Sequence, residues 1–147
     1  MCWEDVKDED VFASTTMTAS VRMLLSEATD FRNEGYTVFT ADVKTAFLNA
    51  HVKDGDVVYA KPPPEWQPET LDPSKGTVKG KLQRSLYGLR SAPRRWKDHL
   101  EQILRKCGFV PDMLDTCLWT HTTKRVCHVD DLLLAGTQQT IKEISLS

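Results

Sequence analysis

The sequence predicts an α+β domain, in which helices and antiparallel strands are joined by hairpins and short turns rather than repeated as βαβ units. Two kinds of pattern lead to this prediction. Apolar residues recur at helical spacing in two segments, and short runs of aromatic and β-branched residues lie between turn signals. With 147 residues, the chain is long enough for one domain with a core of its own.

The first helix is predicted from a stripe at positions i, i+3, i+4 and i+7, formed by Val21, Leu24, Leu25 and Ala28. Thr18 or Ser20 is suited to cap its start, and Gly35 to end it in the left-handed conformation. A strand from Tyr36 to Asp42 follows, with Asp42 at its end, and then a short helical segment from Lys44 to about Leu48.

A hairpin is predicted next. Asp54-Gly55 is a turn signal between His51-Val52 and Val57-Val58-Tyr59. Pro62, Pro63 and Pro64 prevent that strand from continuing, and the polar segment from Glu65 to Gly76 is interpreted as a loop.

The second helix is predicted to begin near Pro93, to end at Gly108 and to bury one stripe, formed by Trp96, Leu100, Ile103, Leu104 and Cys107. Three strands follow, at 117–121, 126–129 and 132–135, with turns at 122–125 and at Asp130-Asp131. We interpret Trp96 as a core residue because of its helical spacing with Leu100.

Composition limits the kinds of site. Cys2, Cys107, Cys117 and Cys127 form no CxxC pair, so they are expected to be free and mostly buried thiols rather than zinc ligands. No apolar run approaches the roughly 18 residues of a membrane span. The acidic segment 1–10 is unlike a signal peptide, which favours an intracellular protein.

Positive charge is concentrated between Lys75 and Lys97. This basic stretch holds 8 of the 19 Lys and Arg residues and none of the 21 acidic ones. It is either an ordinary solvated surface or a surface that binds nucleic-acid phosphates.

Asp42, Asp130 and Asp131 lie at predicted strand ends among apolar residues. Like charges in such surroundings are costly unless a cation neutralises them, and Mg²⁺ prefers carboxylate oxygens. For the Asp-Asp pair alone, a polar hairpin tip with two solvated carboxylates is the competing interpretation.

Three segments carry a resemblance that covers the chain from about Asp10 to Gly136. They are FTADVKTAFLNAHV, KLQRSLYGLRSAPRRWKDHL and HVDDLLLAG, and VFASTTMTASVRMLLSEA precedes them. In this order they resemble the sequence blocks of copia-type retrotransposon reverse transcriptases. The resemblance implies a polymerase palm-like antiparallel sheet packed on helices, with partial fingers.

The same resemblance implies RNA-directed DNA polymerase activity, in which a deoxynucleotide is transferred to a primer 3′-hydroxyl with two Mg²⁺ or Mn²⁺ ions. Asp42, Asp130 and Asp131 would be the catalytic and metal-binding residues. The nucleotide-binding residues would be Phe47, Tyr87 and Gly88. Phe47 would exclude a 2′-hydroxyl, and Gly88 would allow close backbone approach to the nucleotide.

The expected partners are RNA or DNA template-primer, deoxynucleoside triphosphates and the rest of the polyprotein (integrase and RNase H), with no membrane. The expected location is a cytoplasmic virus-like particle or the nucleus. The side chains expected to contact nucleic acid are Lys79, Lys81, Arg84, Arg90, Arg94 and Arg95.

Three features depart from the family pattern. His128 stands where the family has tyrosine, and only residues 122–127 separate CLWTH from HVDD. Segment 1–10 is expected to be an acidic tail, and 11–147 a partial reverse transcriptase domain without upstream fingers or downstream thumb and RNase H. The alternative is therefore a catalytically inactive remnant that keeps some nucleic-acid binding.

Overall fold

The computed structural model describes residues 2–4, 11–53, 56–66, 79–122, 124–128 and 132–138, of which 2–4, 64 and 124–128 are described by their backbone only. The chain divides into two compact units. The first unit is Met1–Ala13 with Thr45–His99, and the second is Ser14–Lys44 with Leu100–Ser147.

Helices and antiparallel strands make up both units, which confirms the predicted mixture of α and β structure. The first unit contains β1 (Cys2–Glu4), α2 (Ala46–Asn49), β3 (Val58–Ala60), the 3-10 helix η3 (Pro64–Trp66) and β4 (Gly80–Lys81). The second contains α1 (Thr18–Asp30), the 3-10 helix η2 (Arg32–Glu34), β2 (Tyr36–Ala41), β5 (Val110–Pro111), β6 (Leu118–His121), β7 (Lys124–His128) and β8 (Leu132–Thr137). Helix α3 (Ala92–Lys106) begins in the first unit and ends in the second.

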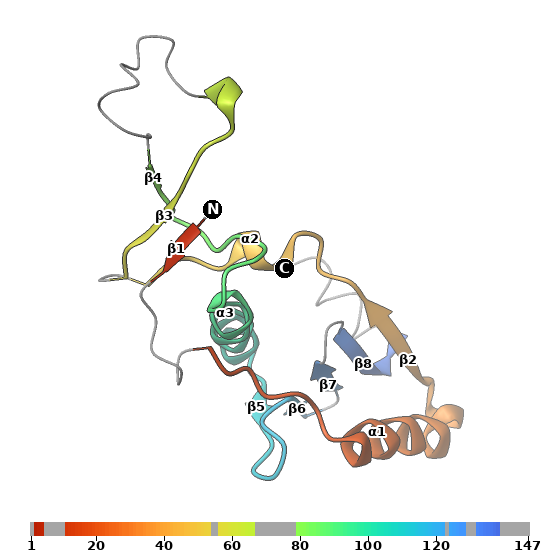
Figure 1. Ribbon diagram of the computed structural model, residues 1–147. Helices are drawn as coiled ribbons and strands as arrows, with labels where there is room; N and C mark the ends of the chain where they lie inside the picture. The colour runs from red at the N-terminus through yellow and green to blue at the C-terminus, as the bar shows by residue number, and fades with distance from the viewer. Residues whose placement is uncertain are drawn as a thin grey trace, which may run out of the picture. The chain divides into compact units, whose positions relative to one another are not determined.

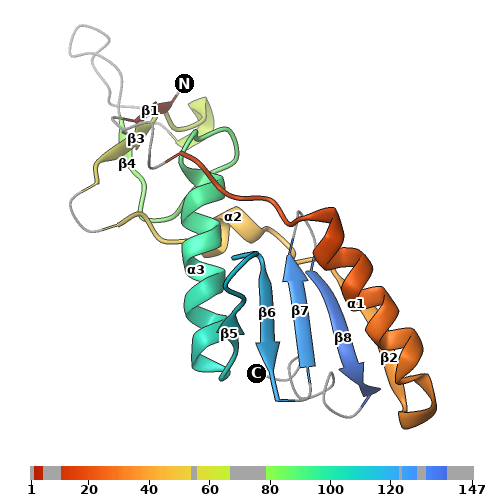
Figure 2. The same cartoon turned by 90° about the horizontal axis from the view of Figure 1, so that it is seen from below.

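The second unit is built on a five-stranded antiparallel sheet with the order β2-β8-β7-β6-β5 (Figure 2). Helix α1 packs against this sheet through a core in which Leu24 and Ala28 meet Leu118 of β6 and Ala135 of β8. These side chains are at most 7% exposed, so they hold the helix on the sheet by apolar burial.

The predicted stripe of α1 is confirmed at Leu24 and Ala28, and Val21 packs against the same core. Leu25 differs, because 45% of its surface is exposed. The predicted caps are wrong: the helix starts at Thr18 after Met17, and neither Thr18 nor Ser20 is the cap residue.

Gly35 does adopt the predicted left-handed conformation, with φ 81°. It closes the 3-10 turn η2, however, whereas α1 itself ends earlier, at Asp30. Strand β2 then starts at Tyr36 as predicted and ends one residue before Asp42.

The first unit contains a three-stranded antiparallel sheet with the order β1-β3-β4 (Figure 1). The predicted hairpin is wrong, because β3 pairs with these two strands and not with His51-Val52. Val52 instead donates its backbone N–H to Gln83, and His51 forms a bridge with Arg84. Asp54-Gly55, the predicted turn, lies outside the described residues.

Helix α3 buries Leu100 and Leu104 and is followed by Gly108 at φ 83°, as predicted. Trp96 is only half-buried, whereas Ile103 and Cys107 are exposed, contrary to the predicted stripe. Cys117 is a buried free thiol as expected. No helix in the described ranges has both the length and the apolar character of a membrane span.

Candidate functional site

Residues at one edge of the five-stranded sheet are sequence neighbours of the predicted carboxylates. Asp42, which is exposed, follows the last residue of β2, and that residue, Ala41, pairs with Leu132 at the start of β8. Leu132 also pairs with His128, the last residue of β7. The ends of three strands therefore meet at this edge, which we call the carboxylate edge.

Asp130 and Asp131 themselves lie outside the described residues. Among the residues that are described, no three His, Cys, Asp or Glu side chains group in a way that could hold a metal ion. Because two of the three expected ligands are not among them, the metal site stays a prediction.

In the hairpin that leads to this edge, the second strand starts earlier than predicted. Strand β6 ends at His121 and β7 already begins at Lys124, where the sequence predicted a turn. Every residue of β7 from Lys124 to His128 has a register partner on β8. The short connection has therefore not removed the strand next to β8.

In the first unit, the structure brings together two of the predicted nucleotide-binding residues. The rings of Phe47 and Tyr87 lie 5.0 Å apart between centroids, at 54°. Phe47 packs against the core formed by Val58, Leu89 and Ala92, whereas Tyr87 is 56% exposed. Because Phe47 is held by the core and Tyr87 is exposed, the ring of Tyr87 is available to a ligand.

The backbone conformation at position 88 requires glycine, whereas crowding by neighbouring atoms does not. The φ of Gly88 is 91°, in the left-handed region, and a Cβ added there would meet no neighbouring atom within 4 Å. Thr45 also has a positive φ, of 55°, which is unusual for a β-branched residue. It precedes α2, the helix that carries Phe47. No local signal in the sequence indicates this strained position.

The six side chains expected to contact nucleic acid fall into two groups. Lys79, Lys81, Arg84 and Arg90 are exposed. Arg94 and Arg95 form ion pairs with acidic residues of the first unit.

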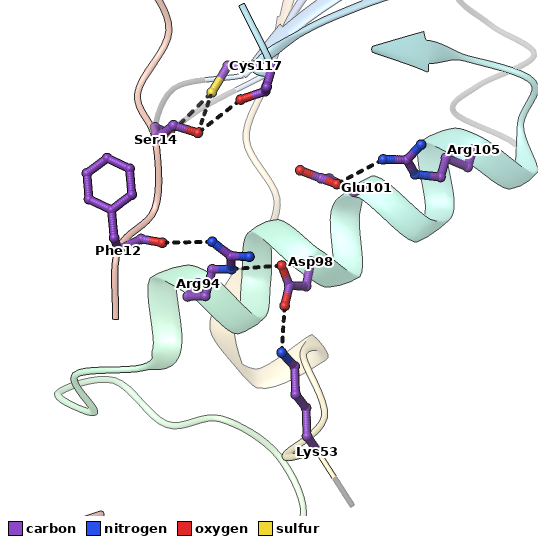
Figure 3. A network of polar contacts seen from close by, with 9 residues as sticks. Phe12, Ser14, Lys53, Arg94, Asp98, Glu101, Arg105 and Cys117 are labelled. Carbon is purple, nitrogen blue, oxygen red and sulfur yellow. Dashed lines mark hydrogen bonds and ion pairs between the residues drawn. The ribbon is translucent and has the colours of Figure 1, made fainter. Parts of the chain in front are cut away.

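The Nε of Arg94 donates to Asp98 at 3.0 Å, and Nη1 donates to the backbone oxygen of Phe12 at 3.4 Å. Asp98 also pairs with Lys53 at 3.0 Å, so it lies between two cations (Figure 3). Arg95 is 5% exposed and pairs with Asp56 at 3.1 Å. Arg95, which was expected to contact nucleic acid, is instead buried and paired with Asp56 within the protein.

Comparison with known proteins gives a consistent result. Residues 3–146 match the family model described as reverse transcriptase (RNA-dependent DNA polymerase). The chain is 30% identical over 137 residues to the retrovirus-related Pol polyprotein from transposon RE1 of Arabidopsis thaliana, covering 90% of this chain and 9% of that protein. No solved structure was found to be similar.

Two further relatives are similar over a smaller share of this chain. The identity is 28% over 135 residues to the retrovirus-related Pol polyprotein from transposon TNT 1-94 of Nicotiana tabacum, covering 87% of this chain and 9% of that protein. It is 32% over 100 residues to the putative transposon Ty5-1 protein of Saccharomyces cerevisiae, covering 65% and 30%. The chain thus spans about a tenth of the length of the Pol polyproteins that it matches.

Proposed function

Because the chain belongs to the reverse transcriptase (RNA-dependent DNA polymerase) family, we propose that it forms the palm and part of the fingers of a copia-type retrotransposon polymerase. The reaction is the transfer of a deoxynucleotide to a primer 3′-hydroxyl, directed by an RNA or DNA template. The partners in this proposal are the template-primer, deoxynucleoside triphosphates and the remaining domains of a longer polyprotein.

The observation that carries the proposal is the carboxylate edge. Ala41 and Leu132 are register partners, and in the sequence they are the neighbours of Asp42 and Asp131. We propose Asp42, Asp130 and Asp131 as the ligands of two Mg²⁺ or Mn²⁺ ions, because hard cations prefer carboxylate oxygens. When bound, two such ions would supply Lewis-acid activation of the attacking hydroxyl and stabilisation of the leaving pyrophosphate.

The remaining predicted residues have roles in positioning. Phe47, held by its core contacts, would limit the space beside the sugar and so select against a 2′-hydroxyl. Tyr87 and Gly88 would lie beneath the nucleotide and template base. Lys79, Lys81, Arg84 and Arg90 are the cations that we propose for phosphate contacts, and buried Arg95 is left out of that surface.

Primer extension on poly(rA)·oligo(dT) with Mg²⁺ or Mn²⁺ tests this proposal. We expect Asp42→Asn, Asp130→Asn and Asp131→Asn each to lower the rate by at least about 100-fold, because each removes one metal ligand. Asp30→Asn is the matched control, since Asp30 is an exposed acid at the end of α1. Equal rates for the three variants and the control would reject the metal site.

A second candidate is an inactive remnant that still binds nucleic acid, which is favoured by His128 in place of the family's tyrosine. The same preparation distinguishes the two. A wild-type chain that binds template-primer but extends nothing, and recovers activity with His128→Tyr, would identify this residue as the defect.

A further inference from the structure

The two sides of strand β3 differ in character. Val58 is 1% exposed and forms a core with Leu89 and Ala92, against which Leu82 packs. Leu82 also donates its backbone N–H to the oxygen of Val58 at 2.9 Å, so these two residues are cross-strand neighbours on the inner side. The next residue along, Tyr59, belongs to the opposite side of the sheet.

That outer side is aromatic and basic. Tyr59 is 38% exposed, and its register partner on β4 is Lys81, which is also exposed. Residues directly opposite in an antiparallel pair project to the same side, as do residues two positions apart on one strand. Lys61 and Lys79, both exposed, therefore continue the same surface, which we call the Tyr59 face.

On β3 and β4, segments 57–61 and 79–84 contain no acidic residue. Strand β1 pairs along the other side of β3, where Trp3 is the register partner of Tyr59. Lys81 also lines a polar pocket of about 280 Å³ together with His51, Lys53 and Gln83. Asp56 is the acid of that pocket, and it pairs with the buried Arg95. The charge on this side of the first unit is consequently suited to an anionic ligand.

We propose that the Tyr59 face binds one strand of unpaired nucleic acid, with Tyr59 stacking on a base and Lys61 and Lys81 contacting the adjoining phosphates. An exposed ring with cations beside it on β3 and β4 favours an unpaired strand, because a base must be unstacked to present its face to a side chain. A duplex could use the lysines but not the ring. The inference rests on the proposed function in taking nucleic acid as the ligand, but it requires no catalytic activity.

The test is fluorescence anisotropy of labelled (dT)₂₀ with the full chain, compared with a blunt 20-base-pair duplex. Loss of one stacked base weakens single-strand binding by about 1–3 kcal/mol, so we expect Tyr59→Leu to raise Kd for (dT)₂₀ about tenfold. Tyr59→Phe keeps the ring and should stay within about twofold of wild type. Duplex affinity should not change in either variant.

The lysines are tested by salt titration. Single strands release about 0.7 counterions per neutralised phosphate, so Lys61→Gln and Lys81→Gln should each flatten the log–log slope by about 0.7. Lys106→Gln, an exposed cation at the end of α3, and Phe12→Leu, an exposed ring at 68%, are the matched controls. Neither control should change the affinity or the slope.

Several results would overturn the inference. They are absence of (dT)₂₀ binding by wild type at 50 mM salt, equal Kd values for Tyr59→Leu and wild type, and equal weakening of duplex binding. If Tyr59→Leu unfolds, as judged by circular dichroism, the two lysine variants decide the question. Failure of the polymerase proposal is seen separately, as primer extension that Asp42→Asn leaves unchanged.

Discussion

Replacing Asp115 by alanine is expected to remove the hydrogen bonds that hold the start of α1 to the loop that precedes β6, and so to destabilise the protein. Asp115 is 5% exposed, and its Oδ2 accepts hydrogen bonds from the backbone N–H of Met17 at 2.9 Å and from the hydroxyl of Ser20 at 2.6 Å. Its Oδ1 accepts from the N–H of Cys117 at 2.9 Å. One carboxylate thus caps the start of α1 from a position about a hundred residues later in the chain.

The expected loss follows from the donors that would be left without an acceptor. A hydrogen bond to a charged group contributes about 1.5–3 kcal/mol, and a helix cap about 1 kcal/mol. Water can reach Met17, whose N–H is only partly buried, so we expect Asp115→Ala to lower the free energy of unfolding by about 3 kcal/mol. Asp115→Asn keeps one acceptor oxygen and should lose about half as much.

The measurement is urea denaturation followed by circular dichroism, together with the melting temperature. For a chain of this size, 3 kcal/mol corresponds to a fall of roughly 6–12 °C in Tm. Asp30→Ala is the control, because Asp30 is exposed at the other end of α1.

A double-mutant cycle isolates the contact with the helix. Ser20→Ala should cost about 1 kcal/mol in the wild-type background and close to nothing in Asp115→Ala, since its acceptor is then absent. The carboxylate does not cap α1 if the free energy of unfolding of Asp115→Ala is within about 0.5 kcal/mol of the wild-type value. The same conclusion follows if the losses of the two single variants simply add in the double variant.

Two further pairs of variants test the packing of the second unit in the same denaturation experiment. Leu24→Ala, at a fully buried position, should lose about 3 kcal/mol, whereas Leu25→Ala, 45% exposed one position later, should lose less than about 1 kcal/mol; similar losses would contradict the assigned helix face. Gly35→Ala should cost about 1 kcal/mol because of its φ of 81° alone, and Gly108→Ala about 2 kcal/mol, since its added Cβ would also lie 3.3 Å from His121; equal losses would show that His121 moves aside freely.

The parts of the fold that were predicted from sequence are those with a local signal. The spacing of Leu24 and Ala28 indicated which side of α1 is buried, Gly35 was identified as a left-handed position, and Gly108 was identified as the end of α3. Strands β1, β4 and β5 were not predicted, because two or three residues cannot establish a periodicity.

Such local patterns could not predict side-chain partners that come from distant segments of the chain. Arg95 lies in an acid-free stretch, so its sequence neighbours indicated an exposed cation, yet Asp56, 39 residues earlier, pairs with it. In the same way, Thr18 and Ser20 offered local caps for α1, but the acceptor that satisfies Met17 and Ser20 is Asp115. A carboxylate accepts more strongly than a hydroxyl, so the distant group displaces the local one.

The candidate site depends on the same kind of distant pairing. The three carboxylates were chosen because each lies at a predicted strand end, but strand ends separated by almost ninety residues meet only if the strands pair in one particular register. The antiparallel pairing of β2 with β8, from Tyr36 with Thr137 to Ala41 with Leu132, supplies that register. A slip of one residue would turn the side chains of a strand to the other side of the sheet. The pairing of Ala41 with Leu132 is therefore the structural fact on which a shared metal site at the carboxylate edge depends.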